Sequence, residues 1–412
     1  MASSEITLEA VPSASDIKAA EWDACAHPKP IPNSLENLDT LAASGSQSNS
    51  CKGAYNPFVS HAFFAAAEAS GSACARTGWG PRHLLARLDG KIAGIVPCYL
   101  KSHSQGEYVF DRGWADAYER AGGRYYPKLQ ASVPFTPATG PRLLIRNGVD
   151  RDQIGTALAS GLMALCNATD ASSVHVTFAP EAEAKFLGAH GFLQRNDQQF
   201  HWHNAGYGTF DDFLTSLNSR HRKAIKRERR EATAAGITIH RLTGADITED
   251  AWDAFFAFYM ETGSRKWGRP YLTRKFFSLI GESMSRDVLL VMAKRNGRWI
   301  AGAINFIGSD TLFGRNWGAV EHHPFLHFEV CYYQAIDFAI ERGLKVVEAG
   351  AQGEHKLARG YLPQTTYSAH FIADPDLRRA IADYLKRERA YVAEVGRELT
   401  EAGPFRKGAD EA

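Results

Sequence analysis

Residues 321–363 read EHHPFLHFEVCYYQAIDFAIERGLKVVEAGAQGEHKLARGYLP and contain the pattern that decides the fold. Apolar residues recur here at three- and four-residue spacing, which predicts a helix from about Phe328 to Arg342 with one buried face. Gly343 ends that helix, the run from Lys345 to Ala349 predicts a buried strand, and a second helix ends at Gly360. In open α/β sheets ligands bind at the carboxyl ends of strands, so the polar residues that follow this strand are the first candidates for a site.

Length and composition describe a globular protein with more than one domain. The chain has 412 residues, of which 44% are hydrophobic and 23% are charged, and this length predicts two domains of about 200 residues each. No apolar run approaches the ~18 residues of a membrane span, and MASSEITLEAVPSASD at the start is no secretory signal, so we expect a cytoplasmic protein. Six cysteines without CxxC spacing predict neither a zinc site nor disulfides. A formal net charge of +1 indicates no particular partner.

Two β-hairpins indicate an internal repeat. HLLARLDGKIAGIVPCYL (83–100) turns at Asp89-Gly90, and VLLVMAKRNGRWIAGAINFIG (288–308) turns at Asn296-Gly297. After each hairpin the pattern predicts a helix, a short strand, a second helix and a Gly-aromatic pair. These elements are 153–166, 173–178, 181–189 and Gly191-Phe192 in the first half, and 328–342, 345–349, a helix through Ala358 and Gly360-Tyr361 in the second. The same order twice predicts a tandem of two similar α/β domains.

The predicted boundaries follow from this repeat. Residues 1–55 form an N-terminal segment in which 27–52, rich in Pro, Ser, Asn and Gly, is expected to be a flexible insertion. Residues 56–205 form the first domain. Residues 206–412 form the second domain, which carries the expected active site and a C-terminal helix.

A basic segment opens the second half. RHRKAIKRERR (220–230) carries seven Lys/Arg against one Glu, and on a helix Arg222, Lys226 and Arg229 project away from the apolar stripe. A solvated helix face is one interpretation. Because unpaired like charges one turn apart repel, the binding of a polyanion is the other.

A second basic stretch mixes cations with aromatic residues. FYMETGSRKWGRPYLTRKFF (258–277) is interpreted as a loop. In one interpretation Arg265, Lys266 and Trp267 contact a ligand with flat and anionic parts. In the other, Trp267 fills the core. Arg315 and Gln352 complete the predicted substrate-binding residues.

The order of elements is similar to that of the GNAT acyltransferases. With NPFVSHAFF (56–64) near the start, the basic helix, and HFEVCYYQAIDFAIERGLKVVEAGAQGEHKLARGY (327–361) near the end, the sequence resembles the FemAB-like family of predicted N-acyltransferases, often labelled peptidoglycan-biosynthesis proteins. The resemblance covers about Asn56 to Phe371. It implies an α/β fold with mixed sheets, built from two GNAT-like domains.

The resemblance also implies a reaction. Fem-type enzymes transfer an amino acid from aminoacyl-tRNA to the amino group of a peptidoglycan precursor, whereas simple GNAT enzymes use acetyl-CoA. We therefore expect an aminoacyl-tRNA or acyl-CoA donor, a cell-wall peptide or peptidoglycan precursor as acceptor, and no tightly bound cofactor or metal. The anionic partner would be tRNA, a nucleotide- or lipid-linked precursor, or CoA.

Two departures from the GNAT pattern stand in the sequence. No Gln/Arg-x-x-Gly-x-Gly/Ala loop, which would bind the CoA pyrophosphate, precedes Phe328. Leu187 and Lys356 occupy the positions, four residues before each Gly-aromatic pair, where a Tyr often protonates the leaving thiolate. The first domain is therefore expected to be non-catalytic, and acetyl-CoA is in doubt as the donor for the second.

Amide formation needs a base, oxyanion donors and an acid for the leaving group. Glu348 or Glu329 is predicted to be the base, because Glu348 ends a buried strand and a buried carboxylate must be paired. Strand N–H groups near Asn305 to Ile307 are the predicted oxyanion donors, with Lys356 or Tyr361 near the leaving group. His355 is a further catalytic candidate, and Glu329 has the alternative role of stabilising a helix dipole.

Two other functions remain open from the sequence. One is an acetyl-CoA-dependent GNAT enzyme that acts on a small molecule. The other is a non-catalytic module that holds an anionic ligand in the cleft between the domains and on the basic helix.

Overall fold

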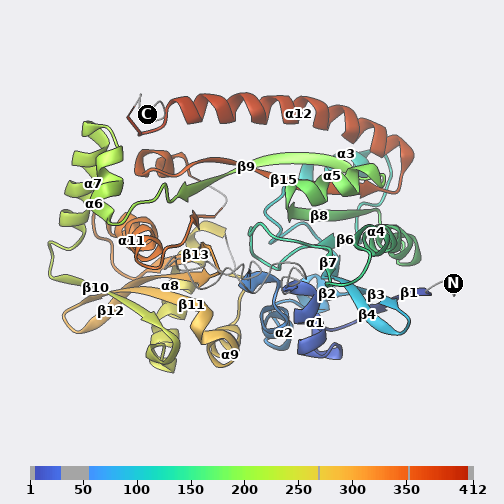
Figure 1. Cartoon of the computed structure of the whole chain (residues 1–412), viewed down its shortest axis with the longest axis horizontal. Coiled ribbons are helices and arrows are strands. Elements are labelled where there is room, and N and C mark those ends of the chain that lie inside the picture. Colours follow the sequence, from blue (N-terminus) through green and yellow to red (C-terminus); the bar gives the residue numbers. More distant parts are fainter. Residues whose placement is uncertain (1–4, 29–54, 268–269, 351–352, 407–412) are drawn as a thin grey trace, which may run out of the picture.

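The computed structural model describes residues 5–28, 55–267, 270–350 and 353–406. Two α/β halves lie side by side, and the long helix α12 (Pro375–Glu401) runs along both of them (Figure 1). The predicted insertion at 27–52 falls almost entirely outside the described residues.

The first half carries strands and helices in the predicted order. Its strands are β1 (Ile6–Val11), β2 (Trp79–Pro81), β3 (His83–Leu88), β4 (Lys91–Val96), β5 (Cys98–Lys101), β6 (Lys128–Ala131), β7 (Leu144–Ile145), β8 (Ser173–Ala179) and β9 (Leu193–His203). Its helices are α1 (Ala19–Ala26), α2 (His61–Ala69), α3 (Arg112–Arg120), α4 (Arg151–Ala168) and α5 (Glu181–Ala189).

The second half repeats this order. Its strands are β10 (Ile237–Thr243), β11 (Val288–Arg295), β12 (Arg298–Ile307), β13 (Thr311–Ala319), β14 (Val346–Glu348) and β15 (Leu362–Ile372). Its helices are α6 (Phe210–Ser216), α7 (Ser219–Ala232), α8 (Glu249–Trp267), α9 (Arg274–Met284), α10 (Leu326–Phe328), a π-helical turn (Glu329–Tyr333), α11 (Gln334–Glu341), a 3₁₀ turn (Glu354–Arg359) and α12.

Both predicted hairpins are present. β3 pairs with β4 and β11 pairs with β12, both antiparallel, and each ladder shifts register just before the turn. All four turn residues, Asp89-Gly90 and Asn296-Gly297, have positive φ. Asn-Gly and Asp-Gly are the pairs that such a two-residue turn favours.

One mixed sheet runs through both halves. In the described residues its order is β10-β11-β12-β13-β14-β9-β15-β8-β6-β5-β2, and a second sheet has the order β1-β3-β4-β7. Parallel pairs occur at β13 with β14 and at β6 with β8, one pair in each half. These pairs place the carboxyl ends of β14 and β8 at equivalent positions.

The halves exchange their last strands. β9 belongs to the first half by sequence but pairs with β14 of the second, and β15 pairs with β8 of the first. The halves are therefore joined by main-chain hydrogen bonds, although the chain passes from one to the other near residue 205. The largest apolar cluster also spans both halves, where Phe58 and Phe63 pack against Phe276 and Phe306.

Three local predictions are corrected. The helix from Phe328 is continuous but contains the π-helical turn Glu329–Tyr333, and the helix before Gly360 is the 3₁₀ turn Glu354–Arg359. The stretch around Arg265, interpreted as a loop, is the last part of α8. Gly263 within it does not end the helix, because the apolar face of α8 is held against the core by Phe255, Phe258 and Tyr259.

Candidate active site

A cavity of about 460 Å³ opens where β13 and β14 separate. Their parallel pairing ends at Phe313 opposite Glu348, while β13 continues to Ala319. Its walls come from both halves: Tyr108, Phe135 and Pro137 from the first, and Gly314, Arg315, Asn316, His327, Tyr332, Ala349, Gly350, Gly353, His355 and Lys356 from the second. The cavity therefore lies at the carboxyl end of the strand that the sequence singled out, and the first half supplies part of it.

Glu348 is buried at the end of β14, with only 5% of its surface exposed. Its carboxylate accepts a hydrogen bond from Arg315 at 3.3 Å and another from the backbone N–H of Thr139. Burial raises the pKa of Glu348 to about 7, against the opposing effect of the Arg315 guanidinium. The predicted parallel pairing and partial desolvation of this carboxylate are confirmed.

Arg315 connects Glu348 to the cavity. Its side chain lines the wall, donates to the Gly314 carbonyl at 2.7 Å, and lies over the rings of Phe58 and Phe313. Its Nε has no hydrogen-bond partner among the described residues. A buried guanidinium with a spare donor beside a cavity is suited to hold a carbonyl or carboxylate oxygen of a ligand.

Lys356 is the second buried cation of the wall. Its Nζ donates to the Gly350 carbonyl at 3.0 Å, and only 2% of the residue is exposed. Burial lowers the pKa of Lys356 to about 7, so the side chain exchanges protons near neutrality. Arg315 and Lys356 thus share the cavity wall, and Glu348 is paired with Arg315.

Aromatic rings form the opposite wall. The Tyr332 hydroxyl lies 2.9 Å from His355 Nε2, and the His327 and Phe328 rings pack against both. His355 is exposed at the cavity and is placed where a substrate would reach it. Such flat surfaces beside cations favour a ligand with a planar group.

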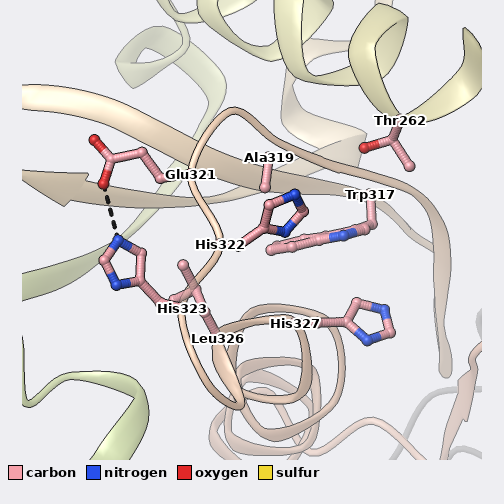
Figure 2. A pocket seen from close by; sticks show the side chains of 8 residues that line it. All are labelled: Thr262, Trp317, Ala319, Glu321, His322, His323, Leu326 and His327. Carbon is pink, nitrogen blue, oxygen red and sulfur yellow. Dashed lines mark hydrogen bonds and ion pairs between the residues drawn. The ribbon is translucent and has the colours of Figure 1, made fainter. Parts of the chain in front are cut away.

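A smaller cavity of about 260 Å³ adjoins the first through His327, which lines both. Figure 2 shows its lining, in which Glu321 is hydrogen-bonded to His323 at 2.8 Å. The rings of Trp317 and His327 pack with their centroids 5.1 Å apart. The site thus extends along β13 beyond the reaction cavity.

Glu329 and Arg229 lie elsewhere and bind each other. Arg229 donates to both carboxylate oxygens of Glu329, at 3.1 and 3.0 Å, and to Asp337 at 2.7 Å. Neither residue lines the cavity. From the sequence, Glu329 was assigned to catalysis and Arg229 to ligand binding, because a pairing across 100 residues has no local signal.

Arg229→Ala should lower the free energy of unfolding by about 2 kcal/mol, since it leaves the 3% exposed Glu329 without its charged partner while Gln334 still donates to it. Urea unfolding measures this effect. Lys226→Ala on the same helix is the matched control, because its partner Asp211 is exposed and such pairs contribute about 0–1 kcal/mol. Equal losses in the two variants would contradict the structural role of the Arg229 pair.

The other candidates are placed as follows. Tyr361 is fully buried, and its hydroxyl donates to the Tyr332 carbonyl at 3.3 Å, one layer behind the wall. Arg222 and Lys226 lie on α7, half-buried and exposed respectively. Arg265, Lys266 and Trp267 end α8, and their side chains, like Gln352, lie outside the described residues.

The predicted oxyanion donors on β12 are not supported. Asn305 and Phe306 pair with β11 on one side and with β13 on the other, and Ile307 pairs with β13, so these residues are used in the sheet. The edge of β13 beyond Phe313, where β14 has ended, is the part of the sheet that borders the cavity.

A buried arginine lies where the parallel strands of the first half separate. Arg142, 1% exposed, donates to the carbonyls of Ala138, Gly140, Pro141 and Thr177 near the ends of β6 and β8. Within the described ranges no group of three or more His, Cys, Asp or Glu side chains could hold a metal ion.

A sequence model of the FemAB-like family, described as peptidoglycan biosynthesis/recognition, matches residues 13–407. The chain belongs to the FemAB-like family. A search of curated protein sequences gave no significant match.

Solved structures show the same fold. The crystal structure of FemX is 13% identical, covers 89% of this chain and 98% of its own, and gives a TM-score of 0.51. A tandem GNAT protein from the clavulanic acid biosynthesis pathway, also 13% identical, covers 90% and 99% with a TM-score of 0.46. The predicted mixed α/β fold with two similar halves is confirmed. No helix in the described part of this FemAB-like chain is both long and apolar enough to cross a bilayer.

Proposed function

We propose that this FemAB-like chain is an N-acyltransferase that moves an acyl or aminoacyl group from an ester or thioester to an amine acceptor. The observation that carries the proposal is the grouping of Glu348, Arg315 and Lys356 around one cavity at the end of β14. A carboxylate with a pKa near neutrality and two cations are what amide formation needs.

Glu348 acts as the general base. Arg315 and Ala349 line the cavity while Glu348 lies directly behind them, so the proton lost by the attacking neutral amine reaches the carboxylate through one water molecule. Arg315 and Lys356 stabilise the negative charge that develops on the carbonyl oxygen. The expected cost of losing such a donor is about 10²- to 10³-fold in rate.

The acceptor that best agrees with the family description is the amino group of a cell-wall peptide or peptidoglycan precursor in the cytoplasm. The donor is aminoacyl-tRNA or an acyl-CoA, used as a substrate with no tightly bound cofactor. The cations of α7, including the half-buried Arg222 and the exposed Lys226, contact the phosphates of the anionic partner.

The test is an acyl-transfer assay with purified protein, a lysine-containing cell-wall stem peptide as acceptor, and either a mixture of aminoacyl-tRNAs or acetyl-CoA as donor. Mass spectrometry of the peptide detects the new amide. Transfer from aminoacyl-tRNA supports the Fem-like reaction, and transfer from acetyl-CoA alone replaces it by a simple acetyltransferase. Binding of tRNA without any amide would overturn the enzymatic proposal in favour of a binding module.

The dependence of kcat/KM on pH should be bell-shaped with its maximum near pH 7. Below this pH Glu348, whose pKa is raised to about 7, becomes protonated and can no longer accept a proton, so the rate falls about tenfold per pH unit. Above it Lys356, whose pKa is lowered to about 7, loses the charge that stabilises the oxyanion. A rate that stays constant from pH 5.5 to 9 would contradict both assignments.

A further inference from the structure

Tyr108 enters the cavity from the first half. It lies on the loop between β5 and α3 and forms part of the wall, and it also borders an adjoining cavity of about 140 Å³ together with Asn316. Its φ is +61°, a left-handed conformation that bulky residues rarely adopt. Phe135, another first-half wall residue, also has a positive φ of 58°. Strained backbone of this kind collects at functional sites, where the surrounding structure enforces it.

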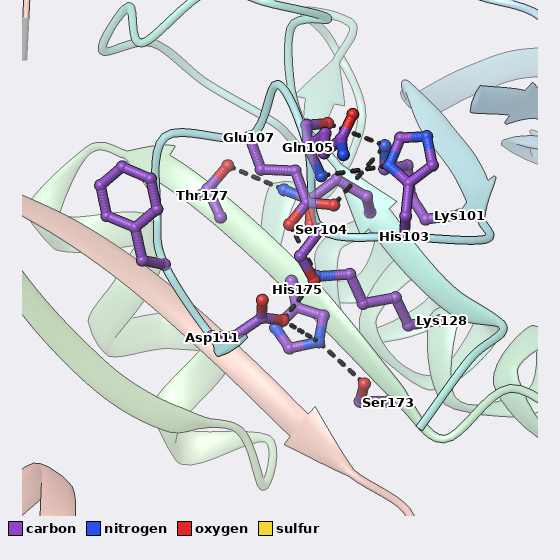
Figure 3. A network of polar contacts seen from close by, with 12 residues as sticks. Lys101, His103, Ser104, Gln105, Glu107, Asp111, Lys128, Ser173, His175 and Thr177 are labelled. Carbon is purple, nitrogen blue, oxygen red and sulfur yellow. Dashed lines mark hydrogen bonds and ion pairs between the residues drawn. The ribbon is translucent and has the colours of Figure 1, made fainter. Parts of the chain in front are cut away.

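Hydrogen bonds from buried charged side chains hold the loop that carries Tyr108 in place. Lys128, fully buried on β6, donates to Ser104 at 2.8 Å, to Glu107 at 2.6 Å and to Asp111 (Figure 3). Lys101 donates to the Gln105 carbonyl at 3.0 Å. These contacts fall on both sides of Tyr108, so they fix the position of its ring.

The Tyr108 hydroxyl is available to a ligand. In the described parts of the chain no group hydrogen-bonds to it. It lies near enough to the Arg315 guanidinium for each group to shift the pKa of the other. Tyr332, the other tyrosine of the cavity wall, has its hydroxyl engaged with His355. Two tyrosines therefore face the cavity, and the one from the first half has the open hydroxyl.

We propose that Tyr108 is a catalytic residue of the second-half site, donating its phenolic proton to the leaving oxygen of an ester donor. The inference rests on the proposed acyl transfer. The amine nitrogen forms a bond to the carbonyl carbon and gives up a proton to Glu348. The carbon–oxygen bond then breaks, its electron pair stays on the leaving oxygen, and that oxygen takes the proton of Tyr108. Proton return from Glu348 to the phenolate through water restores the enzyme.

The chemistry of the leaving group agrees with this role. Burial raises the pKa of Tyr108 above its usual range, so the phenol keeps its proton at neutral pH. An alkoxide is basic enough to accept that proton, whereas a thiolate or a nitrophenolate leaves without help. Tyr108 therefore selects an oxygen ester as the donor class.

The test uses Tyr108→Phe, which keeps the ring and removes the proton. Two donors carry the acyl group that the parent transfers, one as a ribose ester and one as a p-nitrophenyl ester, with the same amine acceptor. We expect kcat to fall about 10²- to 10⁴-fold with the ribose ester and less than about fivefold with the p-nitrophenyl ester. Unchanged thermal unfolding shows that the variant is folded.

Tyr332→Phe is the matched control and should not show this dependence on the leaving group. Equal losses with both donors would make Tyr108 a wall residue only, and no loss with either would remove it from the reaction. A leaving-group-dependent loss in Tyr332→Phe instead would place the acid on the opposite wall. A parent that transfers from acyl-CoA but from neither oxygen ester overturns the Tyr108 assignment and its donor class. A parent that transfers from no ester or thioester overturns the proposed function itself, which separates the two failures.

Discussion

Glu348→Gln should lower kcat for acyl transfer about 10²- to 10⁴-fold while changing the free energy of unfolding by no more than about 1 kcal/mol. Glutamine still accepts the hydrogen bonds that Arg315 and the Thr139 N–H donate, but it cannot take a proton from the acceptor amine. Shape and packing at the end of β14 are retained. The loss should therefore appear in the chemical step.

Single-turnover rates and thermal unfolding of the same preparation separate chemistry from folding. In the Gln variant the acid limb of the pH profile should also disappear, because the group that titrates near pH 7 is gone. Glu282→Gln, an exposed carboxylate on α9, is the control and should behave as the parent. Full activity in the Glu348 variant would exclude it as the base, and a loss of stability together with activity would mark it as a structural carboxylate.

The parts of this structure that local sequence determines were predictable. Asp89-Gly90 and Asn296-Gly297 each adopt the left-handed turn that these dipeptides favour, and the apolar runs beside them form the strands. The pairing of Glu348 with Arg315 follows the same reasoning, since a carboxylate at the end of a buried strand must be paired.

The parts that depend on distant contacts were not predictable. Nothing in the local pattern of β9 indicates that it pairs with β14, more than 140 residues later. The basic run in α7 was interpreted from its charge alone, yet Arg229 is neutralised by Glu329 from another helix. Tyr108 gave no periodic or motif signal, because its role comes from a loop that buried charges hold across the boundary between the halves.

The two halves share a topology but differ at the point where their parallel strands separate. Where β13 and β14 separate, the second half leaves a cavity, and where β6 and β8 separate, the first half places Arg142. The segment before Arg142 then crosses to the second half, where Phe135 and Pro137 line the cavity and Thr139 donates to Glu348. The first half therefore supplies part of the wall of the second-half site and one hydrogen bond to Glu348.

Arg142→Met should lower the free energy of unfolding by about 3–5 kcal/mol, because it leaves four backbone carbonyls in a buried cleft without their donor. Methionine fills a similar volume, so the loss reports hydrogen bonding more than packing. Activity should fall as well, since the segment that brings Thr139 to Glu348 loses its anchor. Urea unfolding and the acyl-transfer assay measure the two effects. The control is Arg397→Met, which replaces an exposed arginine on α12 and should change the free energy of unfolding by less than about 0.5 kcal/mol. A similarly small effect at Arg142 would mean that this part of the first half tolerates unpaired carbonyls.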